Sequence, residues 1–208
     1  EQFMEIGHKY QSFASSILYS EIKDSTIVIS GKGGYLSLTD STFENCTING
    51  QKAYQYFLTS ASWLNCKFEG RFFDCVFGFG FDSTTLKKIP IKIENCDFSN
   101  ANLDIVAFRG GLYYSTCKWP SFPHVLVIAD ELPDNFNELP LPPELIGFLR
   151  VCHRENSHDT AVAYDLTRFD KDLERIYSVT FNVPGFHFFG DSTPLIPNGK
   201  YIESSQAY

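Results

Sequence analysis

Residues 96–110 read CDFSN-ANLDI-VAFRG, three successive blocks of five in which the third residue is large and apolar. The same five-residue step extends along the chain in both directions. Fourteen of the sixteen positions at this step are apolar, whereas the hydrophobic fraction of 43% would give about seven. Helices repeat near 3.6 residues and strands at 2, so this period predicts a repeat architecture. The positions are Val28, Gly33, Leu38, Phe43, Ile48, Ala53, Leu58, Trp63, Phe68, Phe73, Gly78, Ile93, Phe98, Leu103, Phe108 and Tyr113.

The order of residue types within each block resembles the pentapeptide-repeat family, whose unit is Ala, then Asp or Asn, then Leu or Phe, then two free residues. Residues 96–110 carry three adjacent copies, and looser copies begin at Cys46, Ala61 and Cys66. The resemblance covers roughly residues 26–115. It implies a mainly β protein, a right-handed quadrilateral β-helix with four repeats in each coil.

A coil of four blocks predicts that residues twenty apart stack on one face. Asn45-Cys46 and Asn65-Cys66 are twenty apart, and Asn95-Cys96 follows thirty later, which predicts a loop insertion at about residues 79–92. We therefore expect Cys46, Cys66 and Cys96 to stack as reduced thiols. The expected inward columns are Phe43, Trp63, Ile93 and Tyr113; Val28, Ile48, Phe68 and Phe98; Gly33, Ala53, Phe73 and Leu103; and Leu38, Leu58, Gly78 and Phe108.

The pattern changes after Trp119, so we expect residues 1–120 to form the β-helix of about four or five coils and residues 121–208 to close it. The second part is predicted to be a proline-rich connector, a helical hairpin at about residues 143–177 and an aromatic tail. Residues 125–128 form an apolar run that predicts a strand over the open end of the coil. Pro143 suits the first turn of a helix. The apolar face expected for the first helix is Leu145, Ile146, Leu149 and Cys152, and that for the second, starting near Asp159, is Val162, Leu166, Phe169, Leu173 and Ile176.

The six cysteines and the hydropathy of the 208-residue chain suggest a cellular setting. At least three cysteines take small inward positions of the repeat, so buried free thiols in a reducing compartment are favoured over disulfides. The sequence has no apolar run of eighteen residues and no recognisable signal peptide, so we expect no membrane span and a cytoplasmic location. The family's distribution suggests a bacterial or phage source.

Sequence patterns of catalysis are weak in this chain. Cys152-His153 followed by His158-Asp159 is the most enzyme-like group and leaves a hydrolase as a remote alternative, but neighbouring residues on a helix point about 100° apart, which does not suit a nucleophile and its base. Residues 31–34 lack the rest of a phosphate-loop motif, and no cysteine pair has zinc-knuckle spacing. Lys87-Lys88 is the sole adjacent basic pair. We expect no catalytic residue, no cofactor, no metal and no direct nucleic-acid contact.

Charge is concentrated in the second part of the chain. Residues 1–120 have 11 basic and 12 acidic side chains, whereas residues 121–208 have 6 and 13. This asymmetry predicts a monomeric or dimeric protein-binding module, an inhibitor or immunity-type protein that covers a basic toxin or enzyme. The alternative implied by the family resemblance is a topoisomerase-binding DNA mimic, which needs an acidic coil. The candidate partner-binding residues are Asp165, Asp170, Asp172 and Glu174 on the exposed side of the second helix and the aromatics Phe186, Phe188 and Phe189.

Overall fold

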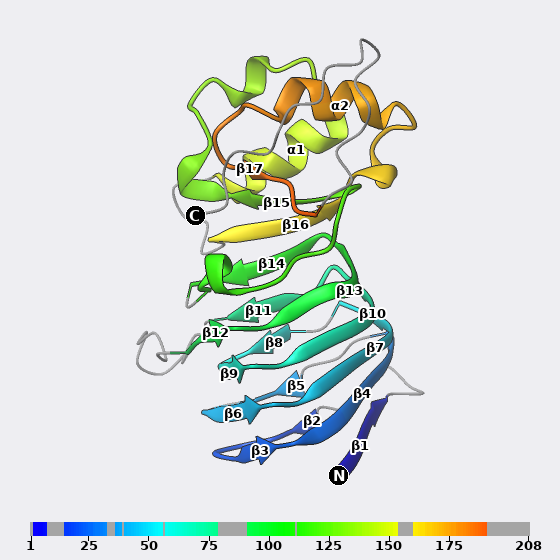
Figure 1. Ribbon diagram of the computed structural model, residues 1–208, viewed down its shortest axis with the longest axis vertical. Helices are drawn as coiled ribbons and strands as arrows, with labels where there is room; N and C mark the ends of the chain where they lie inside the picture. Colours follow the sequence, from blue (N-terminus) through cyan, green and yellow to red (C-terminus); the bar gives the residue numbers. More distant parts are fainter. Residues whose placement is uncertain are drawn as a thin grey trace.

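The protein is mainly β, with parallel sheets and two α-helices. Its computed structural model describes residues 2–7, 15–32, 36–38, 40–55, 57–78, 91–110, 112–153 and 160–190. Residues 2–119, which we call the coil, form a stack of strands, and residues 120–190, which we call the cap, cover one end of that stack (Figure 1). The N-terminus lies at the opposite end of the molecule.

Strands recur in the coil in a fixed order, one long strand and then two short ones in each of the first four turns, whereas the described part of the last turn has one long strand and one short one. The long strands are β1 (Gln2–Gly7), β4 (Ser25–Lys32), β7 (Thr47–Tyr54), β10 (Lys67–Phe73) and β13 (Asp97–Asp104). The next side has β2 (Ser15–Ser16), β5 (Leu36–Ser37), β8 (Phe57–Thr59), β11 (Val76–Gly78) and β14 (Val106–Arg109), and the third has β3 (Glu21–Lys23), β6 (Ser41–Glu44), β9 (Ala61–Leu64) and β12 (Ile93–Glu94).

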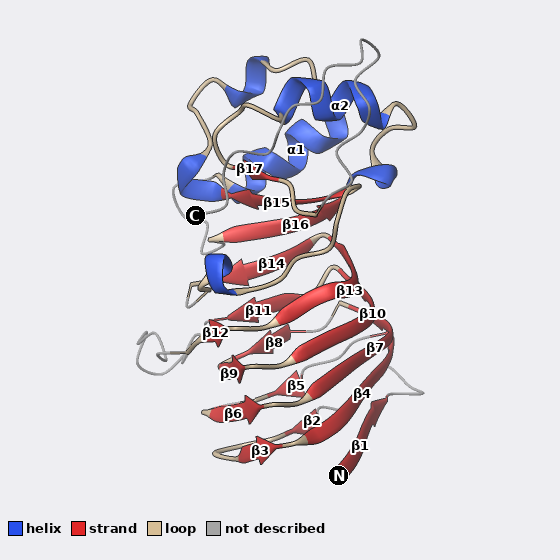
Figure 2. Cartoon of the chain, viewed as in Figure 1, coloured by secondary structure: helices blue, strands red, loops and turns tan. Residues whose placement is uncertain are grey.

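Strands on each side of the coil pair in parallel with their counterparts in the next turn, except that β5 and β8 belong to different sheets. The long strands form one sheet in the order β1-β4-β7-β10-β13, and the third side forms another in the order β12-β9-β6-β3 (Figure 2). On the second side, β8, β11 and β14 pair in sequence, while β2 and β5 form a separate pair. Residues 2–23 therefore add a turn before residue 26, where the recognisable repeats begin.

Residues with left-handed backbone conformation turn the chain at corners between the sides of the coil. In one coil these are Asn45, Gln55 and Ser60, with φ of 54°, 56° and 64°. Asn and Asp tolerate this conformation better than most residues do. The first of these corners recurs at Asp24, Asn45, Asn65 and Asn95, all exposed. The repeated Asn-Cys pair in the sequence thus consists of a corner residue followed by the first inward residue of the next side.

Inward side chains stack into continuous columns, as expected. Phe43 lies opposite Trp63, with ring centroids 4.3 Å apart, and Trp63 lies opposite Ile93. In the next column Ile48 pairs with Phe68, whose ring is 4.4 Å from that of Phe98. Such columns give the stack a continuous apolar interior along its axis.

Four positions in the expected columns are wrong by one residue. Successive turns differ in length, because 21 residues separate Asp24 from Asn45 and the register shifts between Gly70 and Phe72. Gly33 lies outside the described residues. The inward residues are Ile27 in place of Val28, Phe72 in place of Phe73, Phe77 in place of Gly78, and Leu112 in place of Tyr113, which is 48% exposed.

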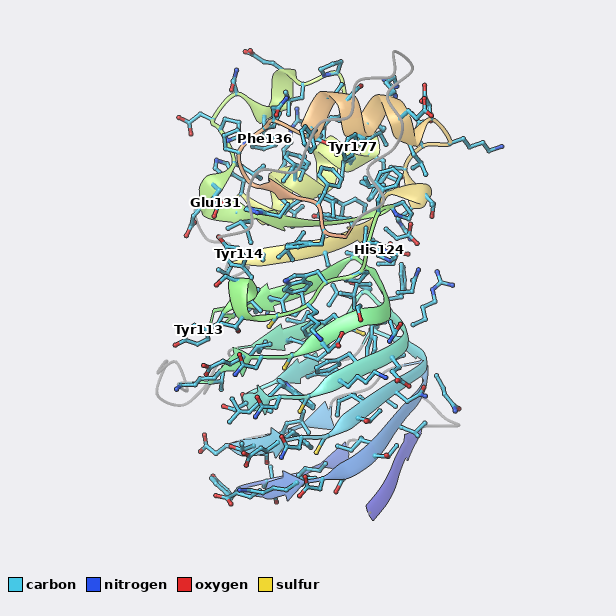
Figure 3. The ribbon with its side chains drawn as sticks, in the orientation of Figure 1. Tyr113, Tyr114, His124, Glu131, Phe136 and Tyr177 are labelled. Atoms are coloured by element: carbon cyan, nitrogen blue, oxygen red, sulfur yellow. The ribbon has the colours of Figure 1, made fainter. Side chains whose placement is uncertain are left out.

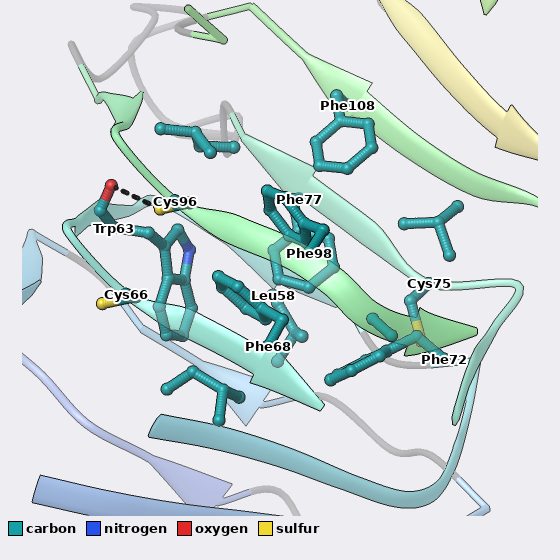
Figure 4. Close-up of a cluster of buried hydrophobic side chains, with 14 of the residues drawn as sticks. Leu58, Trp63, Cys66, Phe68, Phe72, Cys75, Phe77, Cys96, Phe98 and Phe108 are labelled. Atoms are coloured by element: carbon teal, nitrogen blue, oxygen red, sulfur yellow. Dashed lines mark hydrogen bonds between the residues drawn. The ribbon is translucent and has the colours of Figure 1, made fainter. Parts of the chain in front are cut away.

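The cysteine prediction is confirmed. Cys46, Cys66 and Cys96 are buried free thiols that occupy the same place in successive turns. Figure 4 shows Cys66 and Cys96 beside Trp63 on one side of the core, with Cys75 on the other. Most of the predicted insertion, residues 79–90, lies outside the described part of the chain.

The final turn of the coil ends on an aromatic ring. Residues 112–119 run over β12 and β13 through bridges from Leu112 to Ile93 and from Lys118 to Asp97. The 3-10 turn η1 (Tyr114–Thr116) lies between these bridges. Trp119 then stacks on Phe98 with centroids 4.9 Å apart, and its Nε1 donates to Tyr114 O at 2.9 Å. The indole therefore closes the column that contains Phe68.

Antiparallel strands of the cap continue the coil's second side. The cap consists of β15 (His124–Ile128), η2 (Ala129–Glu131), η3 (Phe136–Glu138), α1 (Pro143–Cys152), β16 (Ala161–Asp165), η4 (Leu166–Arg168), α2 (Leu173–Thr180) and β17 (Phe186–His187). β16 pairs with β14, β15 pairs with β16, and β17 pairs with β15. The predicted strand at residues 125–128 exists, but β16 is the strand that covers the coil's open edge.

The first predicted helix is correct and the predicted helical hairpin is not. In α1, Leu145, Ile146, Leu149 and Cys152 are buried, as expected. Ala161, Val162, Ala163 and Tyr164 instead form a strand that pairs with β14 and β15. Both of its faces are buried, because Ala161 and Ala163 pack in the core of the coil and Val162 and Tyr164 pack in the core of the cap. The four-and-three spacing that suggested one helix combines a strand, a 3-10 turn and the start of α2. The proposed hairpin turn, residues 156–158, lies outside the described residues.

Candidate functional site: the acidic cap and its junction with the coil

Three of the predicted acidic residues surround the start of α2. Asp172 is the N-cap, and its Oδ1 accepts a hydrogen bond from Arg175 N at 3.1 Å. Asp170 Oδ2 accepts from Arg175 Nη2 at 2.6 Å. The hydrogen bond from Asp172 N and the Arg175 guanidinium together lower the pKa of Asp170. Asp172 and Glu174 are exposed, so these two residues do present negative charge on the surface.

Asp165 lies elsewhere, which corrects its predicted place on a helix. It ends β16, where Thr167 N and Oγ1 donate to its Oδ1 at 3.0 and 2.6 Å. Asn102 Nδ2 of the coil donates to Asp165 Oδ2 at 2.9 Å. Asp165 therefore joins the cap to the coil.

The three candidate aromatics pack inside the protein or against it. Phe186 is 7% exposed in β17. Phe188 packs against Tyr177, with centroids 4.9 Å apart, and Phe189 packs against Trp119 at 5.9 Å. Phe186 presents no ring to the surface, and the other two are half-buried.

Basic side chains of the cap are mostly engaged within the protein. Of the four in its described residues, Arg168 and Arg175 form ion pairs with Asp104 and Asp170, and Arg150 Nε donates to Asn137 Oδ1 at 2.6 Å. The fourth is Lys171. The elements η3 and α2 lie at the end of the molecule far from the N-terminus (Figure 1). The exposed acidic side chains of the cap are Asp130, Asp134, Glu138, Glu144, Asp172 and Glu174.

A charge cluster around the buried carboxylate of Asp104 lies where the cap meets the long strand β13. Asp104 is 4% exposed, and its Oδ2 accepts from Arg168 Nη1 at 3.2 Å and lies 3.7 Å from Arg71 Nη2. Arg168 Nε also lies 3.9 Å from Glu144 Oε1 of α1, and its guanidinium carbon lies 5.0 Å from the centre of the Phe73 ring. Arg168 thus connects two parts of the coil to the first cap helix.

The two junction carboxyls have pKa values displaced in opposite directions. Burial raises the pKa of Asp104, and the neighbouring Asp165 carboxylate adds to that effect against the opposing arginines. Burial also acts to raise the pKa of Asp165, but hydrogen bonds from Thr167 and Asn102 outweigh it and the pKa is lowered. His124, opposite Asp165 on β15, acts in the same direction as those hydrogen bonds.

This opposition predicts contrasting pH effects for Asp165→Asn and Asp104→Asn. The pKa of Asp165 is lower in the folded protein than in the unfolded chain, where it is about 3.9. Above pH 3.9 this difference makes the free energy of unfolding of wild type larger than that of Asp165→Asn. The difference is lost as pH falls through the folded-state pKa. The raised pKa of Asp104 means that its ionised form disfavours folding. Any gain in the free energy of unfolding that Asp104→Asn has over wild type therefore shrinks as pH falls toward the unfolded-state pKa of about 3.9. Urea unfolding of the three proteins at several pH values measures both trends. Parallel pH profiles for the two variants would contradict this assignment.

A second polar group bridges the coil and the cap on the other side of the junction. Tyr114 Oη donates to Glu131 Oε1 at 3.2 Å, and His187 Nε2 lies 2.6 Å from Glu131 Oε2. Figure 3 shows Tyr114 and Glu131 on one side of the junction and His124 on the other. Burial and the Glu131 carboxylate raise the pKa of Tyr114. This arrangement holds η1, η2 and β17 together.

The enzyme-like residues of the sequence do not form a catalytic arrangement in the described structure. Cys152 is 2% exposed, and His153 Nδ1 lies 3.2 Å from Ala129 O, with its ring 5.2 Å from that of Phe136. His158 lies outside the described residues. Among the residues that can be placed, no group of three or more His, Cys, Asp or Glu is arranged to hold a metal ion. No helix in those same ranges is long and apolar enough to cross a membrane.

Comparison with known proteins adds no relative. No family model matches the chain, and no curated protein or solved structure is significantly similar to it.

Sequence reasoning missed the junction residues Asn102, Asp104 and Arg168. Asn102 and Asp104 occupy outward positions of the repeat, where polar residues are expected in solvent. The sequence shows that these polar residues alternate with apolar ones along β13. Nothing nearby in the sequence indicates that Arg168, 64 residues after Asp104, lies against them.

Proposed function

We propose that this protein is a non-enzymatic, protein-binding module, an inhibitor or immunity-type protein whose acidic cap covers a basic toxin or enzyme. The observation that carries the proposal is the unequal availability of charge in the cap. Its described arginines are engaged within the protein, whereas Asp134, Glu138, Asp172 and Glu174 are exposed. Such a surface steers a basic partner into contact.

Charges on the coil support the cap, and not the coil, as the binding surface. Lys23 Nζ lies 2.8 Å from Glu44 Oε2, Lys67 Nζ lies 2.6 Å from Glu69 Oε1, and Lys118 Nζ lies 3.5 Å from Asp97 Oδ2. A DNA mimic would need an excess of acidic side chains along this face. Because the charges on the coil are paired with one another, we infer that the coil is a rigid support for the cap.

The proposal keeps the resemblance to pentapeptide-repeat proteins, including a four-sided coil. Support comes from the left-handed corners at Asn45, Gln55 and Ser60 and from the register shift beside Gly70, which would mark the fourth turn within the long strand. A cytoplasmic location also belongs to the proposal, because the six free cysteines suit a reducing compartment.

Charge reversal tests the cap as the binding surface. A partner is first purified from lysate of the source cells, and its association rate is measured with wild type, with Glu138→Lys/Glu174→Lys, and with the control Glu21→Lys/Glu94→Lys on the coil. Both variants change net charge equally. We expect the cap variant to lower the association rate roughly tenfold or more at low salt, with little effect of the control. A larger effect of the coil variant would move the site to the β-helix faces and revive the DNA-mimic alternative.

A further inference from the structure

The cysteine column continues one turn beyond the three thiols expected from the sequence. The backbone ladder that carries it is unbroken: Lys67 N donates to Cys46 O at 2.8 Å, Asp97 N to Cys66 O at 2.8 Å, and Lys118 N to Cys96 O at 2.9 Å. The bridge from Asp97 to Lys118 places Cys117 directly opposite Cys96. Cys46, Cys66, Cys96 and Cys117 therefore form a ladder of four free thiols.

Cys117 differs from the other three in its surroundings. Cys46, Cys66 and Cys96 are 1% exposed. Each thiol has two acceptors within reach, the carbonyl two residues earlier and a carbonyl of the preceding turn. The acceptors in the preceding turn are Ile22 O at 3.4 Å, Phe43 O at 3.4 Å and Trp63 O at 3.3 Å. Cys117 is half-buried, and its Sγ lies 4.0 Å from Thr116 Oγ1. The ladder is thus accessible at its Cys117 end.

The two thiols at that end differ in their access to solvent. Cys117 is half-buried, whereas Cys96 is 1% exposed. The thiolate is the form that binds metals, and Cys117 is the thiol that an ion from solvent reaches first.

Strand spacing decides what this pair can hold. Neighbouring strands lie about 4.7–4.9 Å apart. A disulfide needs sulfur atoms at about 2.05 Å and Cβ atoms at about 3.5–4.5 Å, which is closer than that spacing. A zinc–thiolate bond is about 2.3 Å, and at a similar bond length two thiolates on opposite sides of one ion are about 4.6 Å apart. That separation is close to the spacing of neighbouring strands.

We propose that Cys96 and Cys117 form a two-coordinate, linear site for a soft monovalent cation, Cu(I). Soft thiolate ligands select this ion. Each thiol loses its proton to water and forms one S–Cu bond, so the site changes by one Cu(I) gained and two protons released, with no change in oxidation state. Cys117 binds first from solvent and Cys96 completes the coordination. A site with two ligands is compatible with the absence of any larger metal-binding group among the described residues.

Competition with a Cu(I) chelator tests the site. The reduced full chain is titrated anaerobically with Cu(I) in the presence of bicinchoninate, for wild type, Cys117→Ser and the control Cys152→Ser. Cys152 is buried in α1, outside the ladder. We expect wild type and the control to take one Cu(I) from the chelator. Cys117→Ser should lose more than the roughly 10- to 100-fold that removal of a supporting partner costs.

Two further readouts separate binding from folding. X-ray absorption of the loaded protein should show two sulfur neighbours in linear geometry, and one equivalent of Cu(I) should protect Cys117 of the Cys152→Ser variant from alkylation. Circular dichroism tests whether Cys117→Ser is folded. If the variant does not fold, protection of Cys117 from alkylation by Cu(I) in the Cys152→Ser variant tests the site instead. Equal affinity of Cys117→Ser and wild type, three sulfur neighbours, or unprotected Cys117 would overturn the proposal.

Discussion

Phe72→Ala is expected to destabilise the protein by roughly 3–5 kcal/mol, because it removes a buried ring and leaves a cavity in the column. Phe72 is fully buried between Ala53 and Leu103 in the neighbouring turns. Its ring centroid also lies 6.0 Å from that of Phe68 and 6.1 Å from that of Phe77. Chemical denaturation measures the loss as a shift in the unfolding midpoint.

Phe73→Ala is the matched control for Phe72→Ala. Phe73 is the same residue type, one position along β10, but its ring is half-buried on the outer face beneath Arg168. Loss of that cation–π contact should cost about 1 kcal/mol. Equal losses for the two variants, or a larger loss for Phe73→Ala, would restore the column expected from the five-residue step.

Gly70→Ala should also destabilise strongly, by roughly 2–4 kcal/mol, because backbone strain and overpacking act together. Gly70 has φ of +82°, and a Cβ there would lie 2.5 Å from Gly50 O in the turn below. The contact is with backbone, so no side chain can move away to relieve it. Thermal and urea unfolding of the variant measure the effect.

Gly147→Ala provides the opposite expectation. Gly147 lies in α1 with no atom within 4 Å of an added Cβ. Ala in place of an exposed helical Gly should stabilise by about 0.5–1 kcal/mol. A stable Gly70→Ala variant would show that the long side of the coil is more open at its bend than the structure describes. A destabilised Gly147→Ala would show that α1 is not the exposed helix described.

The coil was largely predictable from the sequence because its structure repeats locally. The five-residue step identified Trp63, Phe68 and Phe98 as inward residues, and the Asn-Cys pairs identified positions that stack in successive turns. The inward orientation of Phe72 and Phe77, in place of Phe73 and Gly78, was not predictable. It depends on a register shift beside Gly70, which the chain adopts only where neighbouring turns pair.

By itself, then, the sequence determined the stacked β architecture, the thiol column through Cys46, Cys66 and Cys96, the helix that begins at Pro143 and the acidity of the cap. Tertiary structure decided that residues 161–165 are a strand. Their helical spacing is a weak local preference, which pairing on both sides by β14 and β15 overrides. It also decided that Asp165 and Arg168 bind the coil at Asn102 and Asp104. Burial and ion pairing between segments more than 60 residues apart leave no local pattern in the chain.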